Sequence, residues 1–293
     1  MKKGFSKNNA KKKNMVRNIV IISCIILLVL GILLLSISMK NIIQVSSKDN
    51  SSINVSQDVA SKSTPVVINN LLLGSVYNDT WVSSEKYYFY GDFNTNLSLD
   101  VYTSNGKKGK FKVEEMTKDT KGSAVYISTT NSNKNTEYIA VNSDGKDIMP
   151  NPALKVSNMT DEDYNNIKEA IGIYSLLNSS INIVEAYDIN IDTTTKGRIY
   201  VVTNKSGKGM GGYSAVIYTD MSGKSKIVKY SFVANLKNSS EWPIYSFKFI
   251  ADLNKDGKNE LIIQETREFD VNYSVLEYRK NKFVEVLSSE MKI

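Results

Sequence analysis

The sequence predicts a mostly β protein with an N-terminal transmembrane helix, a small antiparallel β domain, one connecting helix and a C-terminal β repeat domain. Three observations support this fold class. Residues 18–39 form one uncharged, mostly apolar run. From about Val66 onward, short strand-like runs alternate with turn dipeptides such as Asn105-Gly106. A single stretch, which begins at Thr160, instead has apolar residues at helical spacing.

The first 39 residues carry the topology signal. Seven Lys or Arg and no acidic residue precede the 22 uncharged residues 18–39. A helix of that length spans roughly 33 Å, enough for a hydrocarbon core of about 30 Å. Basic residues beside a span stay cytoplasmic, so we expect a single-pass cell-membrane protein in contact with the lipid bilayer, with its C-terminal domains extracytoplasmic. A signal peptide cleaved near Ser36-Ile37-Ser38 and a lipidated Cys24 are the alternatives.

Charge and composition exclude several function classes. The chain has 37 basic and 30 acidic residues, and the seven basic residues of the tail account for its whole net charge of +7. A basic patch on a folded surface is therefore not indicated, and we expect no nucleic-acid partner. Cys24 is the only cysteine and there is no histidine, which excludes a Cys/His zinc site and Cys or His catalysis. The wealth of Lys, Asn and Ile is typical of a bacterial protein.

Residues 40–65 are rich in Ser, Asn and Lys and are interpreted as a flexible stalk. Residues 66–155 are predicted to form the antiparallel β domain, with hairpin turns at Asn105-Gly106 and Asp144-Gly145. Its predicted strands are Tyr87–Phe93, Leu97–Thr103, Gly109–Glu115, Ser123–Thr129 and Thr136–Asn142.

Residues 156–179 contain the predicted connecting helix. Thr160 is suited to be its N-cap, and three acidic residues follow in the first turn, where the helix dipole favours them. The helix is expected to end near Asn178. Its apolar stripe predicts core contact between the two β parts, with a partner-binding face as the alternative. The stripe consists of Tyr164, Ile167, Ile171 and Tyr174.

Residues 180–293 contain an internal repeat. Asp188–Asp192 opens one copy and Asp252–Asp256 opens the other, 64 positions later. Tyr213-Ser214 and Tyr273-Ser274 follow at an offset of 60, and each copy ends in a strand-like run. Repeats of this length predict propeller blades or stacked sheets, and two copies are too few to close a propeller alone. A partial propeller or a sandwich is expected.

The second copy contains the sharpest chemical motif of the chain. Acidic or amide side chains at alternate positions of a tight loop can point inward together, and Gly257 permits the sharp turn. The sequence therefore predicts a Ca²⁺ site; a polar turn without metal is the alternative. An EF-hand is excluded because its twelfth position holds Ile263. The predicted ligands are Asp252, Asn254, Asp256, the carbonyl of Lys258, and Glu260.

The string FIADLNKDGKNELII resembles the calcium loop of FG-GAP/VCBS repeats, which are found in integrin-like β-propellers. The resemblance covers about 110 of the 293 residues. It implies propeller blades and Ca²⁺ binding at the second loop. The Phe-Gly and Gly-Ala-Pro elements of the family are absent, and Thr193 replaces the loop glycine in the first copy. The first copy is therefore expected to bind weakly or not at all.

Other motifs give little support for an enzyme. The glycine-rich stretch 207–212 precedes a strand-like run instead of a helix, so no nucleotide is expected. Glu114 and Glu115 are adjacent on a predicted strand and point to opposite faces. Trp81 and Trp242 are candidates for sugar contact. We expect a non-enzymatic interaction or assembly module for an envelope protein or cell-wall glycan, with a carboxylate hydrolase as the alternative and a helix-linked sensor as a third possibility.

Overall fold

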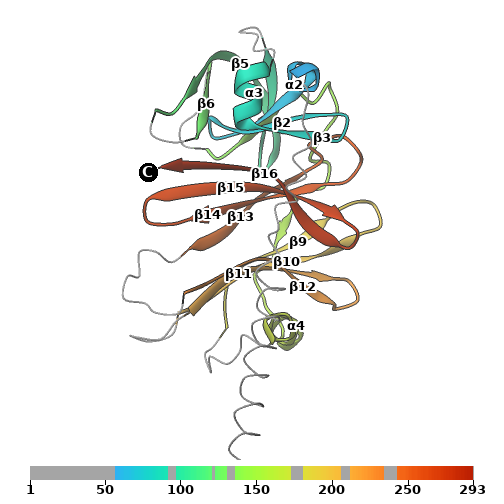
Figure 1. Cartoon of the computed structure of the whole chain (residues 1–293). Helices are drawn as coiled ribbons and strands as arrows, with labels where there is room; N and C mark the ends of the chain where they lie inside the picture. The colour runs from blue at the N-terminus through green and yellow to red at the C-terminus, as the bar shows by residue number, and fades with distance from the viewer. Residues whose placement is uncertain are drawn as a thin grey trace, which may run out of the picture. The chain divides into compact units, whose positions relative to one another are not determined.

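The computed structural model describes residues 57–91, 97–120, 123–130, 136–172, 181–205, 212–233 and 243–292. These residues belong to one compact unit and form three antiparallel β-sheets and three short helices (Figure 1). The sheets have seven, five and four strands and are named by those numbers below.

The seven-stranded sheet comes first in the chain. Its elements are α2 (Gln57–Lys62), β1 (Thr64–Ile68), β2 (Leu71–Tyr77), β3 (Thr80–Ser83), α3 (Ser84–Tyr90), β4 (Ser98–Thr103), β5 (Gly106–Lys118), β6 (Val125–Thr129) and β7 (Ile139–Val141). The strand order is β1-β7-β4-β5-β6-β2-β3, and β1 also pairs with β2, so six strands close into a ring. Because side chains alternate along a strand, Leu72 packs inside the ring with Tyr87 of α3, whereas Leu71 and Leu73 face outward.

The other two sheets are consecutive meanders. The five-stranded sheet contains β8 (Leu154–Lys155), β9 (Asn182–Asn190), β10 (Lys196–Lys205), β11 (Gly212–Asp220) and β12 (Ser225–Val233), and α4 (Asp161–Ile171) lies between β8 and β9 in the chain. The four-stranded sheet contains β13 (Ile244–Ala251), β14 (Glu260–Thr266), β15 (Asp270–Arg279) and β16 (Lys282–Lys292). Each sequence repeat thus corresponds to one four-stranded meander, with its Tyr-Ser pair on the third strand, β11 or β15.

Four apolar clusters fix the order of the layers. One joins the outer face of the seven-stranded ring to the four-stranded sheet, and a second joins the four-stranded to the five-stranded sheet. A third fills the ring with α2 and α3, and a fourth lies between the five-stranded sheet and α4. The four-stranded sheet is therefore the middle layer, as Figure 1 shows. Both of its faces are buried: Ile262 packs on one side, and Leu261 and Ile263 on the other.

The predicted N-cap of α4 is confirmed. The Thr160 side chain accepts a hydrogen bond from the Asp163 N–H, and the Asp163 carboxylate accepts one from the Thr160 N–H at 2.7 Å. Ile167 and Ile171 pack on the outer face of the five-stranded sheet. The expectation that this helix makes core contact between two β parts is wrong for the described residues, because Ile167 and Ile171 pack on one sheet only. Tyr174 of the predicted stripe lies outside the described residues. Tyr164, predicted in the stripe, is 42% exposed.

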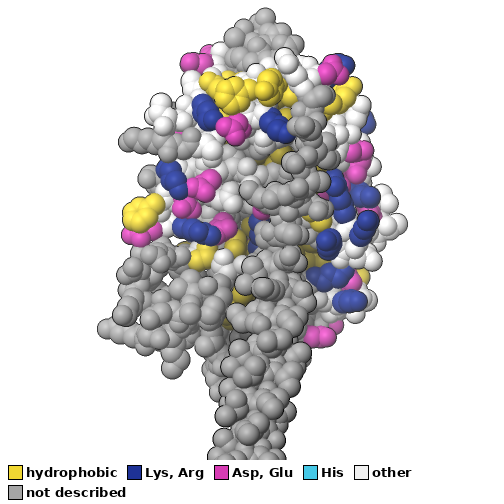
Figure 2. Space-filling model, viewed as in Figure 1, with side chains coloured by type: hydrophobic (Ala, Val, Ile, Leu, Met, Phe, Trp, Pro, Cys, Tyr) yellow, Lys and Arg dark blue, Asp and Glu magenta, His cyan; other side chains and the backbone are white. Residues whose placement is uncertain are grey.

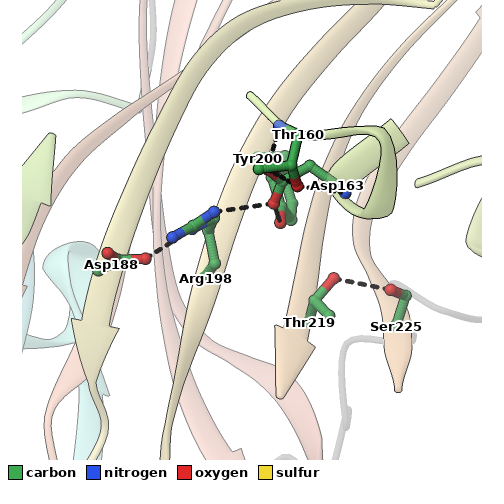
Figure 3. A network of polar contacts seen from close by, with 7 residues as sticks. All are labelled: Thr160, Asp163, Asp188, Arg198, Tyr200, Thr219 and Ser225. Atoms are coloured by element: carbon green, nitrogen blue, oxygen red, sulfur yellow. Dashed lines mark hydrogen bonds and ion pairs between the residues drawn. The ribbon is translucent and has the colours of Figure 1, made fainter. Parts of the chain in front are cut away.

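A polar network ties α4 to that sheet (Figure 3). Arg198 on β10 donates to Asp163 at 2.8 Å and to Asp188 on β9 at 2.6 Å, and Tyr200 also donates to Asp163. Burial opposes the charge on Asp163, but the hydrogen bonds from Tyr200, Thr160 and Arg198 hold its pKa below the ordinary value. Asp163 and Asp188 are thus structural acids held by one guanidinium.

The transmembrane part of the predicted fold class needs correction. Residues 18–39 lie outside the described residues, and within the described ranges no helix is long and apolar enough to cross a membrane. The fold class is corrected to a mostly β protein of three sheets. The single-pass membrane localisation and the sidedness that followed from it are withdrawn.

Three further predictions differ from the structure. The described part of the predicted strand Tyr87–Phe93 is not a strand, because Tyr87–Tyr90 belong to α3, which the Ser83 side chain caps by accepting a hydrogen bond from the Lys86 N–H. Residues 57–65 are not stalk, since they form α2 and the start of β1. Asp144-Gly145 forms a turn but not a hairpin, because β7 pairs with β1 and β4. The Asn105-Gly106 turn between β4 and β5 is confirmed.

Close approach of the sheets predicts an intolerant glycine. A Cβ at Gly74 on β2 would lie 2.4 Å from the Val82 carbonyl oxygen and 2.6 Å from a Leu287 methyl group. Gly109 on β5 has nearly the same φ, +155° against +151°, but open space around it. Gly74→Ala should therefore destabilise the protein by about 1–3 kcal/mol more than Gly109→Ala in urea unfolding. Equal losses would show that φ strain alone, and not the clash, decides the outcome.

Candidate cation loop at the junction of the three sheets

The predicted calcium loop lies between β13 and β14, and its backbone is folded by its own side chains. The Asp252 carboxylate accepts a hydrogen bond from the Gly257 N–H at 3.0 Å, and Asn254 Oδ1 accepts one from the Asp256 N–H at 3.2 Å. Gly257 has φ +88°, a conformation that glycine adopts without a steric penalty. Lys255 is also left-handed, with φ +65°, which is uncommon for a residue with a Cβ.

Glu260, the first residue of β14, closes the loop from inside the protein. Its side chain is fully buried, and Oε2 accepts a hydrogen bond from the Leu253 N–H at 2.8 Å. Burial raises the pKa of Glu260 well above its usual range, and the nearby carboxylates of Asp256 and Asp252 raise it further. Glu260 is thus a buried carboxyl group with a hydrogen bond to one oxygen only, close enough to Asp252 and Asp256 for their charges to raise its pKa.

Buried polar atoms without partners gather in this loop. Asp252 Oδ1, Asn254 Nδ2 and Glu260 Oε1 are buried and have no hydrogen-bond partner among the described residues. Burial also raises the pKa of Asp252, and the charge of Asp256 adds to the effect. An unsatisfied buried polar atom costs about 1–3 kcal/mol, more if charged. Two of these three atoms are carboxyl oxygens of one loop, and neither has a hydrogen-bond donor among the described residues.

No side-chain cation in the described part of the chain supplies that partner. Lys255 turns away from the loop and forms an ion pair with Asp144. Lys258 is exposed, and its backbone N–H donates to Asp256 Oδ1 at 2.8 Å. No Lys or Arg among the described residues forms an ion pair with Asp252, Asp256 or Glu260. The described residues thus provide no basic side chain as a partner for the acids of the loop.

All five predicted ligand residues belong to this loop or its closing strand, but the three acids among them do not form a cluster that could hold a metal ion. Within the parts of the chain that the structure describes, no three Asp, Glu, His or Cys side chains lie close enough to hold a metal ion. Asp256 is exposed, and its Oδ1 accepts a hydrogen bond from the Lys258 N–H at 2.8 Å. Asp252 and Glu260 form the inner half of the donor set, and Asp256 and the Lys258 carbonyl belong to the exposed half.

The first repeat copy has a shorter and satisfied loop. Asp192, not Asp188, opens it, because Asp188 lies within β9 and pairs with Arg198. Thr194 and Thr195 donate backbone and side-chain hydrogen bonds to the Asp192 carboxylate. Burial opposes this charge, but the four hydrogen bonds outweigh it and lower the pKa of Asp192 to about 2. This carboxylate has no unmet need for a cation.

The loop also contacts all three sheets, which sequence reasoning missed. The Asp252 N–H donates to the Ile148 carbonyl at 2.9 Å, in the segment that leaves the seven-stranded sheet. Asn259 donates from its side chain to the Asn190 carbonyl at 2.7 Å and from its backbone to the Ile191 carbonyl at 2.6 Å. No local signal could reveal these bonds, because their partners are at least 68 positions away.

The other predicted candidates stay separate from this loop. Glu114 and Glu115 are exposed on β5, and Trp81 donates to Glu277 at 3.0 Å. Residues 207–211 of the glycine-rich stretch and Trp242 lie outside the described residues. Figure 2 shows hydrophobic side chains gathered over α3, whose residues Phe89 and Tyr90 are exposed. Among the described residues, none of these features places two carboxylates in one shared site.

Comparisons with known proteins do not identify a relative. No family model, no curated protein and no solved structure matches this chain. The resemblance of the loop to FG-GAP/VCBS repeats therefore stays a prediction.

The buried Glu260 predicts a pH dependence of the metal-free protein. Its folded pKa lies above its unfolded value of about 4.3, so the neutral form stabilises the fold in acid and that stability is lost as pH rises towards the folded pKa. In EDTA, Glu260→Gln should remove this loss and raise the free energy of unfolding at pH 7 by about 1–3 kcal/mol relative to wild type.

Urea unfolding at pH 4 to 8 would measure the effect. Glu114→Gln, on the exposed face of β5, is the matched control and should follow the wild-type profile. If Glu260→Gln also follows that profile, its carboxyl does not titrate in a buried site.

Proposed function

We propose that this protein is a calcium-stabilised, non-enzymatic interaction module. One observation carries the proposal: Asp252 Oδ1 and Glu260 Oε1 are buried in one loop, and neither has a hydrogen-bond partner or a side-chain cation among the residues that the structure describes. Hard oxygen ligands in a flexible loop are the donor set that Ca²⁺ prefers. The cation would supply the positive charge that the loop lacks.

The proposed ligands fall into two groups, those already held in place by hydrogen bonds and those that would move when a cation binds. Asp252 and Glu260 are held from inside by the Gly257 and Leu253 N–H groups, so their free oxygens are fixed before a cation arrives. Asp256 would exchange its hydrogen bond to Lys258 for the cation and so free the outer side of the loop to close. Asn254 Oδ1 and the Lys258 carbonyl would complete the shell. Binding thus needs a small contraction of an existing loop.

Three acids outside the loop that expose little surface support a structural role for the fold. Asp100 is paired with Lys107 at 2.8 Å, Asp163 with Arg198 at 2.8 Å, and Glu285 with Lys229. A carboxylate held by a cation is poorly suited to be a general base or nucleophile. We therefore favour a binding or assembly module over the carboxylate hydrolase, with a protein or a glycan as the partner that such a module would engage.

A thermal melt of the full chain tests the calcium site. For an affinity of about 10⁻⁴–10⁻³ M, about 2 mM Ca²⁺ should stabilise the protein by about 0.6–1.8 kcal/mol over EDTA, which raises Tm by roughly 1–7 °C. Asp256→Ala should lose this shift because it removes an outer ligand. Asp192→Ala, which removes the aspartate of the first-copy loop, should keep it.

Two results would contradict the proposal. An unchanged Tm of wild type in Ca²⁺ would leave the loop as a polar turn. Turnover of a glycan or peptidoglycan substrate that is abolished by one Asp or Glu substitution would make the protein a hydrolase instead.

A further inference from the structure

The cation loop is anchored to different layers at its two ends. Leu253 packs into the apolar cluster between the seven-stranded and four-stranded sheets. Asn259, six positions later, is 8% exposed and bonded to the β9 end of the five-stranded sheet. A change in the shape of the loop therefore acts between two interfaces, not within one hairpin.

Asn259 occupies a special place among the loop residues. It lies between two predicted ligands, the Lys258 carbonyl and Glu260. The Lys258 carbonyl and the Asn259 N–H belong to one planar peptide group, in which they point in opposite directions. Because that N–H donates to the Ile191 carbonyl at 2.6 Å, the Lys258 carbonyl points away from the five-stranded sheet. Fixing this carbonyl also fixes the direction of the Asn259 N–H.

We propose that Asn259 couples cation binding in the loop to the stability of the corner between β9 and β10 of the five-stranded sheet. This inference rests on the proposed calcium site. A bound cation would hold the Lys258 carbonyl, which precedes Asn259, and the Glu260 side chain, which follows it. The Asn259 side chain then keeps its 2.7 Å hydrogen bond to the Asn190 carbonyl, and the corner between β9 and β10 opens less often.

The coupling is local because other contacts also join these two sheets. Glu185 on β9 accepts a hydrogen bond from the Phe247 N–H at 3.1 Å, and Ser231 on β12 lies 3.0 Å from the Tyr245 hydroxyl. Lys229 and Glu285 form a buried ion pair between β12 and β16. These contacts do not involve the loop, so the two sheets stay docked without a cation, and the effect is confined to β9 and β10.

Hydrogen exchange of the full chain, with EDTA or about 2 mM Ca²⁺, tests this coupling. In wild type, Ca²⁺ should slow exchange in peptides from the loop, 252–260, and from β9 and β10, 182–203. In Asn259→Ala, the loop should keep its protection, while the calcium-dependent protection of β9 and β10 should fall roughly two- to tenfold, as expected for one lost hydrogen bond. Asn190→Ala is the matched control, because its backbone carbonyl remains the acceptor, and it should behave as wild type.

A second variant separates coupling from folding and from affinity. Asn259→Asp keeps the size of the side chain and adds a carboxylate to the loop, but it cannot donate to the Asn190 carbonyl. It should bind Ca²⁺ at least as well as wild type and still lose the protection of β9 and β10. This variant gives the answer if Asn259→Ala does not fold.

The outcomes distinguish the two proposals. If Ca²⁺ protects the loop but not β9 and β10, or if both Asn259 variants keep the protection of β9 and β10, the coupling is overturned and the calcium site stands. If Ca²⁺ protects neither region of wild type, the calcium site is overturned and the coupling falls with it.

Discussion

Both faces of the four-stranded sheet are covered by the neighbouring sheets, and the rest of the structure depends on this constraint. Ile262 packs towards the seven-stranded sheet, and Leu261 and Ile263 pack towards the five-stranded sheet. Antiparallel sheets commonly keep one wet face. Here the neighbouring layers cover both faces, and at roughly 25 cal/mol per Å² of apolar surface this burial outweighs any single polar contact. The order of the layers therefore follows from the two apolar faces of the last meander.

Polar contacts between the sheets determine the relative orientation of the sheets more than the stability of their packing. Trp81 donates to Glu277 at 3.0 Å between the seven-stranded and four-stranded sheets. Lys229 and Glu285 pair between the four-stranded and five-stranded sheets; burial opposes the charge on Glu285, but Lys229 keeps its pKa below the ordinary value. Buried ion pairs contribute little net stability because desolvation offsets their attraction. Their directional bonds still favour one placement of sheet on sheet.

Features that depend on near neighbours could be predicted from the sequence, and features that depend on distant contacts could not. The Asn105-Gly106 turn and the Thr160 cap are local, and both were predicted. The aromatic run of α3 favours a strand by propensity, but the Ser83 cap and the burial of Tyr87 inside the ring decide for a helix. The donor residues of the loop were visible in its spacing. Its bond from Asn259 to the Asn190 carbonyl was not, because 69 positions separate the partners.

Glu260 stays buried without an ion-pair partner because the apolar packing on both sides of the loop prevents its side chain from turning to solvent. Ile250 and Leu253 hold the start of the loop in two different apolar clusters, and Leu261 holds its end. Glu260 cannot turn to solvent without withdrawing Leu261 from the core, a loss of roughly 2–5 kcal/mol if the side chain is no longer buried. That exceeds the cost of about 1–3 kcal/mol for one unsatisfied buried group. The apolar packing of the sheets thus keeps acids without partners buried in the loop. The proposed cation would stabilise these acids without changing either of the two apolar clusters that hold the loop.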